Sequence, residues 1–386
     1  MFSIETAEQV AAALELPDWV LEKSAAWTYA CFGFFGDSFE DIVKTRFPEP
    51  YAAAQQWVHV NQHPFAKRLP YLNPWHCIAS ILGYFAVIVT FRLFGRFLGK
   101  CTCRNLGLFH NLGLHLLSLY MSVGLMVSAR AAGYTVWNNA AGTSRAEWRI
   151  AKLIWLFYVS KVVEWVDTLI MLLKQNYHQV SFLHIYHHAT IFAMWWLASM
   201  KAPGGEAYYS AMVNSAIHVV MYGYYFLTLL FPSGAVRSVL NRFKFVITKG
   251  QMTQFAFNCM QSAYDLVLVP RAQLKYSAPL LQALFWYMIS LLALFGNFLM
   301  KGSKRAHHHT HRAAAAEHSS VAAKEASLKK TGEGDAVKVG MTKVQVREQQ
   351  KLSKHKNGTN GTSASQKTAI HPNAATQANA EPVFRH

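Results

Sequence analysis

Long apolar stretches alternate with short polar connections through the middle of the chain. A helix that crosses a bilayer needs about 20 mainly apolar residues, and seven segments approach that length. They cover residues 78–97, 106–129, 150–173, 182–200, 208–231, 243–269 and 278–300. The sixth is the least apolar, and the third carries charges inside it. The pattern therefore predicts an all-α polytopic membrane protein with seven transmembrane helices.

The two ends of the chain do not continue this pattern. Residues 1–70 contain one apolar stretch, 25–35, which is too short to span a bilayer, so they are predicted to form a luminal or interfacial segment. Residues 301–386 are rich in Ala, His, Lys, Ser and Thr without apolar periodicity, which predicts a disordered, basic cytosolic tail. The predicted seven-helix domain is residues 71–300.

Composition favours one membrane protein over several soluble domains. Apolar residue types make up 52% of the 386 residues and charged types 15%, whereas soluble proteins average about 25% charged residues. Five Cys without a CxxC pair exclude a disulfide scaffold and a zinc ribbon. The net charge of +17 raises the question of nucleic acid, but the bases are scattered singly without interleaved aromatic residues, so no nucleic-acid partner is predicted.

Lys and Arg in the short connections predict the orientation, because cytosolic loops are enriched in them. One side would carry Arg96, Lys100, Arg104, Lys174, Arg237, Arg242, Lys301, Lys304 and Arg305, and the other Arg145, Arg149, Lys201, Arg271 and Lys275. The first set is larger, so that side is predicted to be cytosolic. Seven spans then put the N-terminus in the lumen and the C-terminus in the cytosol.

The third predicted span contains ionisable groups, which are costly inside a bilayer and usually face a functional cavity. Its sequence K-V-V-E-W-V-D-T runs from Lys161 to Thr168 and includes Asp167. Lys161 and Glu164 are three positions apart, and Glu164 and Thr168 four, so they share one helix face. A Lys161–Glu164 ion pair would either fix helix packing or support a reaction centre.

The fourth predicted span opens with three histidines. His184, His187 and His188 lie at i, i+3 and i+4, which places their imidazoles on one helix face. A lone histidine on an apolar face is usually a packing residue. Three within five residues at the start of a membrane helix indicate chemistry instead.

Two further predicted spans carry polar stripes. In 208–231 the stripe is Asn214, His218, Met221, Tyr222 and Tyr225, so His218 supplies a fourth imidazole that can meet the other three across a bundle. In 243–269 it is Thr248, Gln251 and Gln254, which would bind a polar ligand or join helices. His110 and Asn111 in 106–129 are weak signals on their own.

Two kinds of chemistry fit four imidazoles. Membrane di-iron desaturases and hydroxylases use His-x-x-His-His boxes, but they need several, and only one occurs here beside His218 and the isolated His110 and His115. One Zn or Fe held by three or four His stays an alternative. The favoured interpretation is metal-free acyl transfer, in which imidazole attacks a thioester or acts as a base and amides stabilise an oxyanion.

Four blocks resemble the ELO family of microsomal fatty-acid elongases, in the family's order. They are K-V-V-E-W-V-D-T from Lys161, H-I-Y-H-H from His184, N-S-A-I-H-V-V-M-Y from Asn214 and T-K-G-Q-M-T-Q from Thr248. The resemblance covers about residues 70–300. It implies a very-long-chain 3-ketoacyl-CoA synthase, an acyltransferase that condenses acyl-CoA with malonyl-CoA and releases CO2 and CoA without a cofactor or metal. It also implies that six of the seven helices surround a tunnel for the acyl chain.

The resemblance also implies roles for individual residues. His187 is expected to be the nucleophile that forms an acyl-histidine, and His184, His188 and His218 are expected to act as a base, orienting groups or malonyl contacts. The expected substrate-binding and supporting residues are Asn214, Gln251, Gln254, Tyr222, Lys161, Glu164, Asp167 and Gln179. Lys174, Arg242 and Lys244 would contact CoA phosphates, although membrane topology explains these bases equally well.

Finer likeness concerns the substrate and the cellular setting. Q-V-S-F-L-H-I-Y-H-H-A-T from Gln179, A-P-G-G-E-A-Y from Ala202 and H-V-V-M-Y-G-Y-Y-F-L from His218 resemble elongases of polyunsaturated fatty acids from algae, lower plants and protists. This likeness implies polyunsaturated C18–C20 chains, with saturated or monounsaturated chains as the alternative. The family implies the endoplasmic reticulum membrane and its lipids, a ketoacyl-CoA reductase, a dehydratase and an enoyl-CoA reductase as partners, and a homodimer as a possibility.

Overall fold

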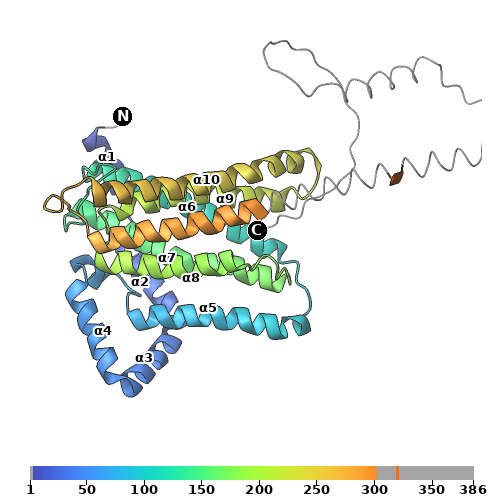
Figure 1. Ribbon diagram of the computed structural model, residues 1–386, viewed down its shortest axis with the longest axis horizontal. Helices are drawn as coiled ribbons and strands as arrows, with labels where there is room; N and C mark the ends of the chain where they lie inside the picture. Colours follow the sequence, from blue (N-terminus) through green and yellow to red (C-terminus); the bar gives the residue numbers. More distant parts are fainter. Residues whose placement is uncertain (1–2, 302–318, 321–386) are drawn as a thin grey trace, which may run out of the picture. The chain divides into compact units, whose positions relative to one another are not determined.

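All regular elements in the described part of the chain are helices (Figure 1). The structure is a computed structural model that describes residues 3–301 and 319–320. The N-terminal segment contains α1 (Ile4–Ala13), α2 (Asp18–Thr28), α3 (Phe34–Arg46) and α4 (Pro48–Asn61). The long helices are α5 (Pro74–Phe94), α6 (Arg104–Ala131), α7 (Arg145–Leu173), α8 (Phe182–Lys201), α9 (Ala207–Leu230), α10 (Gly234–Val267) and a last helix, Ala278–Lys301. Short helical turns are η1 (Tyr29–Gly33), η2 (Pro64–Arg68) and η3 (Gly95–Leu98).

Each of the seven predicted spans coincides with one long helix, with shifted boundaries. Within the described part of the chain, four helices are suited by length and composition to cross a membrane: Pro74–Leu98, Arg104–Ala131, Ala207–Leu230 and Ala278–Lys301. The helices α7, α8 and α10 are not among these four, because charged, histidine and amide side chains lower their hydropathy. The start of α7 precedes the predicted residue 150, because Ser144 and Glu147 form a capping box there.

Several polar side chains from the middle of α10 onward point inward. On α10, Thr248, Gln254 and Asn258 are buried, whereas Phe243 and Phe257 are exposed. This arrangement is the reverse of a helix on the surface of a soluble protein. These buried polar groups lower the mean hydropathy of α10. Because they face other helices, they are not exposed on the apolar outer surface of the bundle.

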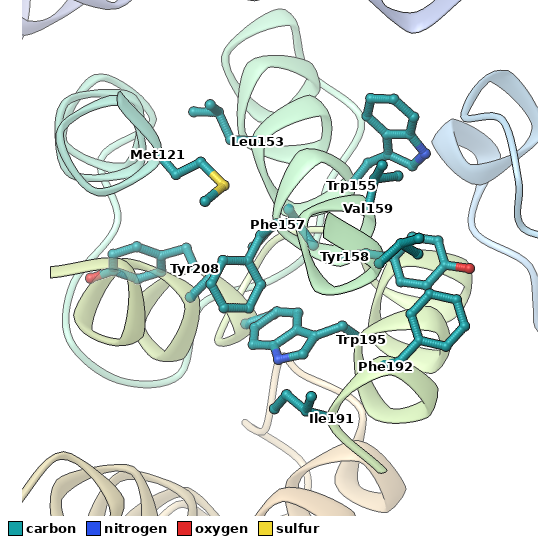
Figure 2. Close-up of a cluster of buried hydrophobic side chains, with 14 of the residues drawn as sticks. Met121, Leu153, Trp155, Phe157, Tyr158, Val159, Ile191, Phe192, Trp195 and Tyr208 are labelled. Carbon is teal, nitrogen blue, oxygen red and sulfur yellow. The ribbon is translucent and has the colours of Figure 1, made fainter. Parts of the chain in front are cut away.

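The hydrophobic core centres on α7, which is buried along most of its length (Figure 2). The ring of Phe157 meets Trp195 of α8 edge-on, with centroids 4.5 Å apart, and Tyr158 stacks on Phe192 of α8 at 4.9 Å. The buried residues of α7 are largely consecutive, so they lie on every side of the helix. The α7 helix contacts α5, α6, α8 and α9, so the Lys161–Thr168 segment lies at the centre of the bundle.

The remaining helices are arranged around this centre. The α6 and α9 helices lie side by side, α10 packs against α9, and α3 packs against α5 (Figure 1). The first compact unit of the chain ends at Phe298. The predicted tail, residues 301–386, lies outside the described residues except for 301 and 319–320, and the predicted domain boundaries stay predictions.

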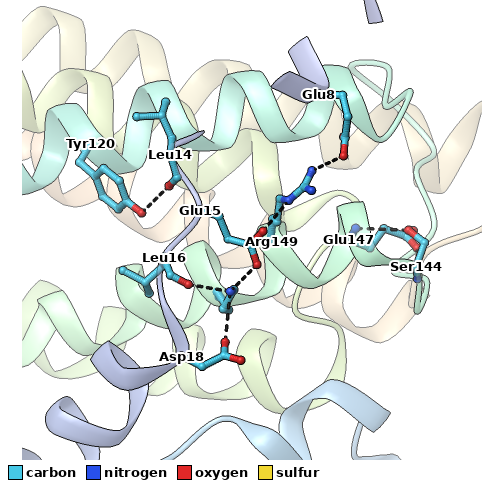
Figure 3. A network of polar contacts seen from close by, with 10 residues as sticks. Glu8, Leu14, Glu15, Leu16, Asp18, Tyr120, Ser144, Glu147 and Arg149 are labelled. Carbon is cyan, nitrogen blue, oxygen red and sulfur yellow. Dashed lines mark hydrogen bonds and ion pairs between the residues drawn. The ribbon is translucent and has the colours of Figure 1, made fainter. Parts of the chain in front are cut away.

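The N-terminal segment is held to the start of α7 by a network of charges (Figure 3). Arg149 donates to Glu8 at 2.7 Å and to Glu15 at 2.9 Å, and Lys152 contacts Glu15 at 2.7 Å and Asp18 at 3.2 Å. Burial raises the pKa of Glu15, but hydrogen bonds from Lys152 and Arg149 outweigh this effect and hold the pKa below its usual value. Two buried cations of α7 therefore have partners that the bundle helices alone do not supply.

Candidate active site

The three histidines of α8 lie against one another at the start of the helix. The hydroxyl of Ser181 caps α8 by accepting the backbone N–H of His184 at 3.3 Å. The ring centroids of His184 and His188 are 4.3 Å apart, and those of His187 and His188 are 5.7 Å apart. The imidazoles share one face of α8, as their spacing predicts.

Side chains of α7 and α5 hold this cluster in place. The Thr168 hydroxyl lies 2.7 Å from Nε2 of His184 and 3.1 Å from the Tyr84 hydroxyl of α5. The indole N–H of Trp165 donates to the backbone carbonyl of His188 at 3.1 Å. The Nδ1 atoms of His187 and His188 are buried and have no hydrogen-bond partner among the described residues. His187 therefore combines a fixed helix position with a ring nitrogen that is available to a ligand.

The fourth imidazole is joined to the ion pair of α7. Lys161 donates to Glu164 Oε1 at 2.6 Å, and His218 Nδ1 of α9 lies 3.4 Å from the same oxygen. The ammonium of Lys161 also lies 3.8 Å from the ring centroid of Phe157. The spacing-based prediction of a Lys161–Glu164 pair is confirmed, and the pair reaches His218 of α9.

A second carboxylate of α7, Asp167, has partners from two other helices. Its Oδ1 atom lies 3.0 Å from Nε2 of His110 on α6, and its Oδ2 atom accepts the Tyr222 hydroxyl of α9 at 2.8 Å. The ring of Tyr222 stands edge-on to His218, with centroids 5.5 Å apart. His110 was only a weak signal in the sequence, because its partner lies on another helix.

An apolar cavity begins at His187 and lies between α8, α9, α10 and the last helix. On α8 it is lined by His187, Ile191, Trp195 and Ala198, which are spaced to form one continuous face. His187 and Ala198 are eleven positions apart, which corresponds to about 16 Å along the helix axis at the helical rise per residue. The cavity therefore has a largely apolar wall along α8, with His187 in its lining.

The end of the cavity away from His187 contains a buried carboxyl group. Glu206 is 1% exposed and accepts hydrogen bonds from the backbone and side-chain amides of Asn139 and from Gln261. Burial raises the pKa of Glu206 to about 8, and the carboxylate of Asp265 adds to the rise, although hydrogen bonds from Asn139 act in the opposite direction. The carboxyl group therefore ties the connection before α9 to α10.

Gly205 lets the chain approach closely enough for this contact. Its φ is +52°, and a Cβ atom there would lie 2.8 Å from Asn139 O and 2.9 Å from Ala141 N. The pattern A-P-G-G-E-A-Y carries only a subgroup likeness, so Glu206 is not among the site residues predicted from the sequence. The paired glycines before an acidic residue were the signal that could have found it.

The predicted supporting residues divide between the cavity and its surroundings. Asn214 donates to Gln254 at 3.4 Å, and both line the cavity. Gln251 instead contacts the sulfur of Met221 at 3.5 Å, and it does not line the cavity. Gln179 lies in the connection between α7 and α8, outside the cavity lining.

The three predicted CoA contacts lie at the end of the bundle where α8 begins. Lys174 caps the end of α7, while Arg242 is exposed and Lys244 half-buried on the first half of α10. Arg104 at the start of α6 reaches the backbone carbonyl of Leu229 near the end of α9 at 3.4 Å, which joins the same helix ends. The basic end and the cavity therefore lie on opposite sides of the histidine cluster.

Metal coordination was the alternative interpretation of the histidines. Within residues 3–301 and 319–320, no three His, Cys, Asp or Glu side chains form a group arranged to hold a metal ion. The histidine nitrogens are instead engaged with Thr168, Asp167 and Glu164 or left without a partner. The metal-free site stays a prediction.

These features define a multi-pass helical membrane protein with a histidine cluster at one end of an apolar cavity. The model of the ELO family (GNS1/SUR4 family) matches residues 69–311. A relative named fatty acid elongase 6, from Leishmania major, is 65% identical over 376 residues, covering 95% of this chain and 98% of the relative. The chain belongs to the ELO family.

More distant relatives match about half of the chain. Very long chain fatty acid elongase 5 from Xenopus tropicalis is 37% identical over 203 residues, or 52% of this chain and 65% of the relative. The human protein of the same name is 36% identical over 214 residues, or 54% of this chain and 69% of the relative. The resemblance inferred from four sequence blocks is confirmed.

Proposed function

We propose that this protein is a fatty-acid elongase that acts as a 3-ketoacyl-CoA synthase. It condenses an acyl-CoA with malonyl-CoA to a 3-ketoacyl-CoA two carbons longer, with release of CO2 and CoA. The observation that carries the proposal is the unpartnered Nδ1 atom of His187 at the start of an apolar cavity. The names of the relatives, which describe elongases of fatty acids, support it.

The first half of the reaction transfers the acyl group to the protein. The lone pair of neutral His187 attacks the thioester carbonyl, the carbon–sulfur bond breaks, and the imidazole proton passes to sulfur, so that CoA leaves as the thiol. The acyl chain lies in the cavity along Ile191, Trp195 and Ala198. The amides of Asn214 and Gln254 lie in the same lining and stabilise the oxyanion.

The second half forms the new carbon–carbon bond. Malonyl-CoA loses CO2, and the enolate carbon attacks the acyl carbonyl on His187. The carbon–nitrogen bond breaks, the 3-ketoacyl-CoA leaves, and His187 takes up one proton from the surroundings. His184, His188 and His218 orient the malonyl group and stabilise its enolate. The ring of His188 lies 5.7 Å from that of His187 and 4.3 Å from that of His184.

The two substrates enter from the basic end of the bundle. Lys174, Arg242 and Lys244 bind the phosphates of CoA there, because point charges suit phosphate groups. A CoA thioester held at that end directs its acyl chain past the histidines into the cavity. The anionic part of the substrate then stays near water while the apolar part is enclosed.

All seven long helices span the membrane in this proposal, and six of them surround a tunnel for the acyl chain that includes the cavity between α8, α9, α10 and the last helix. The inward-facing polar groups of α7, α8 and α10 explain why these helices have low hydropathy and still belong inside a bilayer. The protein resides in the endoplasmic reticulum with its C-terminus in the cytosol, where it works with a ketoacyl-CoA reductase, a dehydratase and an enoyl-CoA reductase. A homodimer is compatible with the exposed apolar surface of α5.

The substrates in this proposal are polyunsaturated C18–C20 acyl-CoAs. The sequence blocks around Gln179, Ala202 and His218 support this choice through their likeness to polyunsaturated-chain elongases. An assay with saturated, monounsaturated and polyunsaturated acyl-CoAs of equal length distinguishes the alternatives. Higher turnover of saturated chains would remove the polyunsaturated assignment but keep the elongase.

The test is a reaction of the purified protein in detergent with acyl-CoA and malonyl-CoA, followed by mass spectrometry. We expect a 3-ketoacyl-CoA that depends on malonyl-CoA and, without malonyl-CoA, an acyl adduct on the peptide that contains His187. His187→Ala should abolish both. Wild-type protein that forms no longer product would refute the proposal, and full turnover by His187→Ala would refute the nucleophile. Loss of activity with a chelator, restored by metal, would revive the metal alternative.

A further inference from the structure

His110 lies outside the four sequence blocks that resemble the family, yet it reaches the centre of the bundle. Its side chain on α6 is 5% exposed, and its Nε2 atom lies 3.0 Å from Oδ1 of Asp167 on α7. An ionised carboxylate only accepts hydrogen bonds, so the imidazole N–H is the donor in this contact. His110 thus holds one of the two oxygens of a carboxylate in the candidate site.

The other oxygen of that carboxylate holds Tyr222. The Tyr222 hydroxyl of α9 donates to Oδ2 of Asp167 at 2.8 Å, and the Tyr222 side chain is almost completely buried. Its ring stands edge-on to His218 at 5.5 Å and edge-on to His110 at 6.2 Å. The carboxylate of Asp167 therefore connects α6, α7 and α9. Through Tyr222 it is linked to His218, a histidine of the candidate site.

A parallel connection lies one turn away on α7. Glu164 binds His218, and Asp167, three positions later, binds Tyr222, which is four positions after His218 on α9. Two carboxylates on one face of α7 thus meet two side chains on one face of α9. The two contacts together fix both the rotation of α9 against α7 and the orientation of the His218 ring.

We infer that His110 is a positioning residue, which acts through Asp167 to hold Tyr222 against His218 at the reaction centre. This inference rests on the proposed elongase function. Without His110, Asp167 would keep a single donor while its side chain is 18% exposed. A carboxylate that lacks a partner on its buried side turns toward water, since an unsatisfied buried charge is costly. Tyr222 would then lose its partner, and His218 would lose the ring that fixes it.

A histidine whose hydrogen bond only joins two helices would affect stability but not kcat. His115 is such a residue and serves as the comparison. His115 lies on α6 as well, and its Nδ1 atom is 2.9 Å from the backbone carbonyl of Val219 on α9. Both histidines therefore join α6 to a neighbouring helix. Only His110 is connected by hydrogen bonds to Asp167 and Tyr222, so a comparison of the two separates positioning from packing.

The experiment compares His110→Phe, His110→Gln and His115→Phe as full-length protein in detergent. Phe keeps the ring volume without the donor, whereas the amide nitrogen of Gln can reach the position of Nε2. We expect His110→Phe to lower kcat by about 10- to 100-fold, as loss of partners that orient reacting groups does, with KM for acyl-CoA unchanged. His110→Gln should recover most of that loss, and His115→Phe should keep kcat although both Phe variants lower Tm.

A double variant provides the second readout. If His110 acts through Tyr222, His110→Phe combined with Tyr222→Phe should have the kcat of the weaker single variant, not the product of two losses. Equal losses of kcat in His110→Phe and His115→Phe, or multiplicative losses in the double variant, would overturn the inference while leaving the elongase intact. Wild-type protein without condensing activity would overturn both.

Discussion

The Oε1 atom of Glu164 lies 3.4 Å from Nδ1 of His218 and joins the middle of α7 to the middle of α9. The same oxygen accepts the ammonium of Lys161 at 2.6 Å. All three side chains are almost completely buried. One carboxylate therefore compensates a buried cation and orients the fourth imidazole of the candidate site.

Removing one member of the Lys161–Glu164 pair should destabilise the protein strongly. Lys161→Met leaves a buried carboxylate whose remaining partner among the described residues is His218, and loss of one partner of a buried pair costs about 3–5 kcal/mol. Lys161→Met/Glu164→Leu removes both charges and should recover most of the thermal stability in detergent but not the elongation activity. A double variant that is no more stable than the single variant would show that the pair is not the source of the effect.

A larger side chain at Ala198 should shorten the acyl chains that the protein uses. Ala198 lines the cavity away from His187, so Ala198→Phe fills the space that the end of a long chain needs. We expect turnover of the longest acyl-CoA substrates to fall at least tenfold, which corresponds to about 1.4 kcal/mol, while shorter ones react normally. Ala193→Phe on the same helix, outside the cavity lining, is the control and should leave the chain-length profile unchanged.

The raised pKa of Glu206 predicts that stability depends on pH. Because the pKa rises from 4.5 to about 8 in the folded protein, the protonated form stabilises the fold, and this contribution is lost as the pH rises from about 4.5 to about 8. The Gln side chain of Glu206→Gln is neutral at every pH. The difference in Tm, variant minus wild type, should therefore increase from about pH 4.5 to about pH 8 and stay constant above that range. A Tm difference that does not vary with pH would show that Glu206 does not titrate there.

The lowered pKa of Glu15 predicts the opposite dependence for the N-terminal segment. Its pKa lies below the usual value of 4.5, so its contacts with Arg149 and Lys152 stabilise the protein above about pH 4.5 and are lost as the pH falls through the folded-state pKa. Acidification should therefore lower the protection of α1 against hydrogen exchange, measured relative to the intrinsic exchange rate at each pH.

At neutral pH, Glu15→Gln should reproduce part of this effect. A charge-assisted hydrogen bond contributes about 1.5–3 kcal/mol, so amide exchange in α1 should rise at least tenfold. Glu22→Gln, at an exposed position of α2, is the matched control and should not change exchange. Equal exchange in the two variants would mean that Glu15 does not hold the segment.

Much of the candidate site could be predicted because its residues are close together in the chain. The spacing of His184, His187 and His188 places three imidazoles on one face of any helix, and the spacing of Lys161 and Glu164 allows their ion pair in the same way. Helix positions were also predictable from hydropathy, since each span must supply a long apolar stretch.

Contacts between distant segments were not predictable. Glu206 meets Asn139 and Gln261, and Arg149 meets Glu8 and Glu15, in each case from elements far apart in the chain. No periodicity links such residues, because their meeting depends on the order in which the helices are packed. The same applies to His110, whose partner Asp167 lies on the next helix.

The amino-acid order alone thus determined which segments are helical, which faces of them are polar and which family the chain belongs to. Helix formation and facial polarity depend on neighbours within a few residues, so they can be read along the chain. Only the packing of α7 into the centre of the bundle decided that Glu164 meets His218, that Asp167 joins His110 to Tyr222, and that a cavity leads from His187 to Glu206. These relationships need several helices at once, because hydrogen bonds and cavity walls form only between surfaces that tertiary structure brings together.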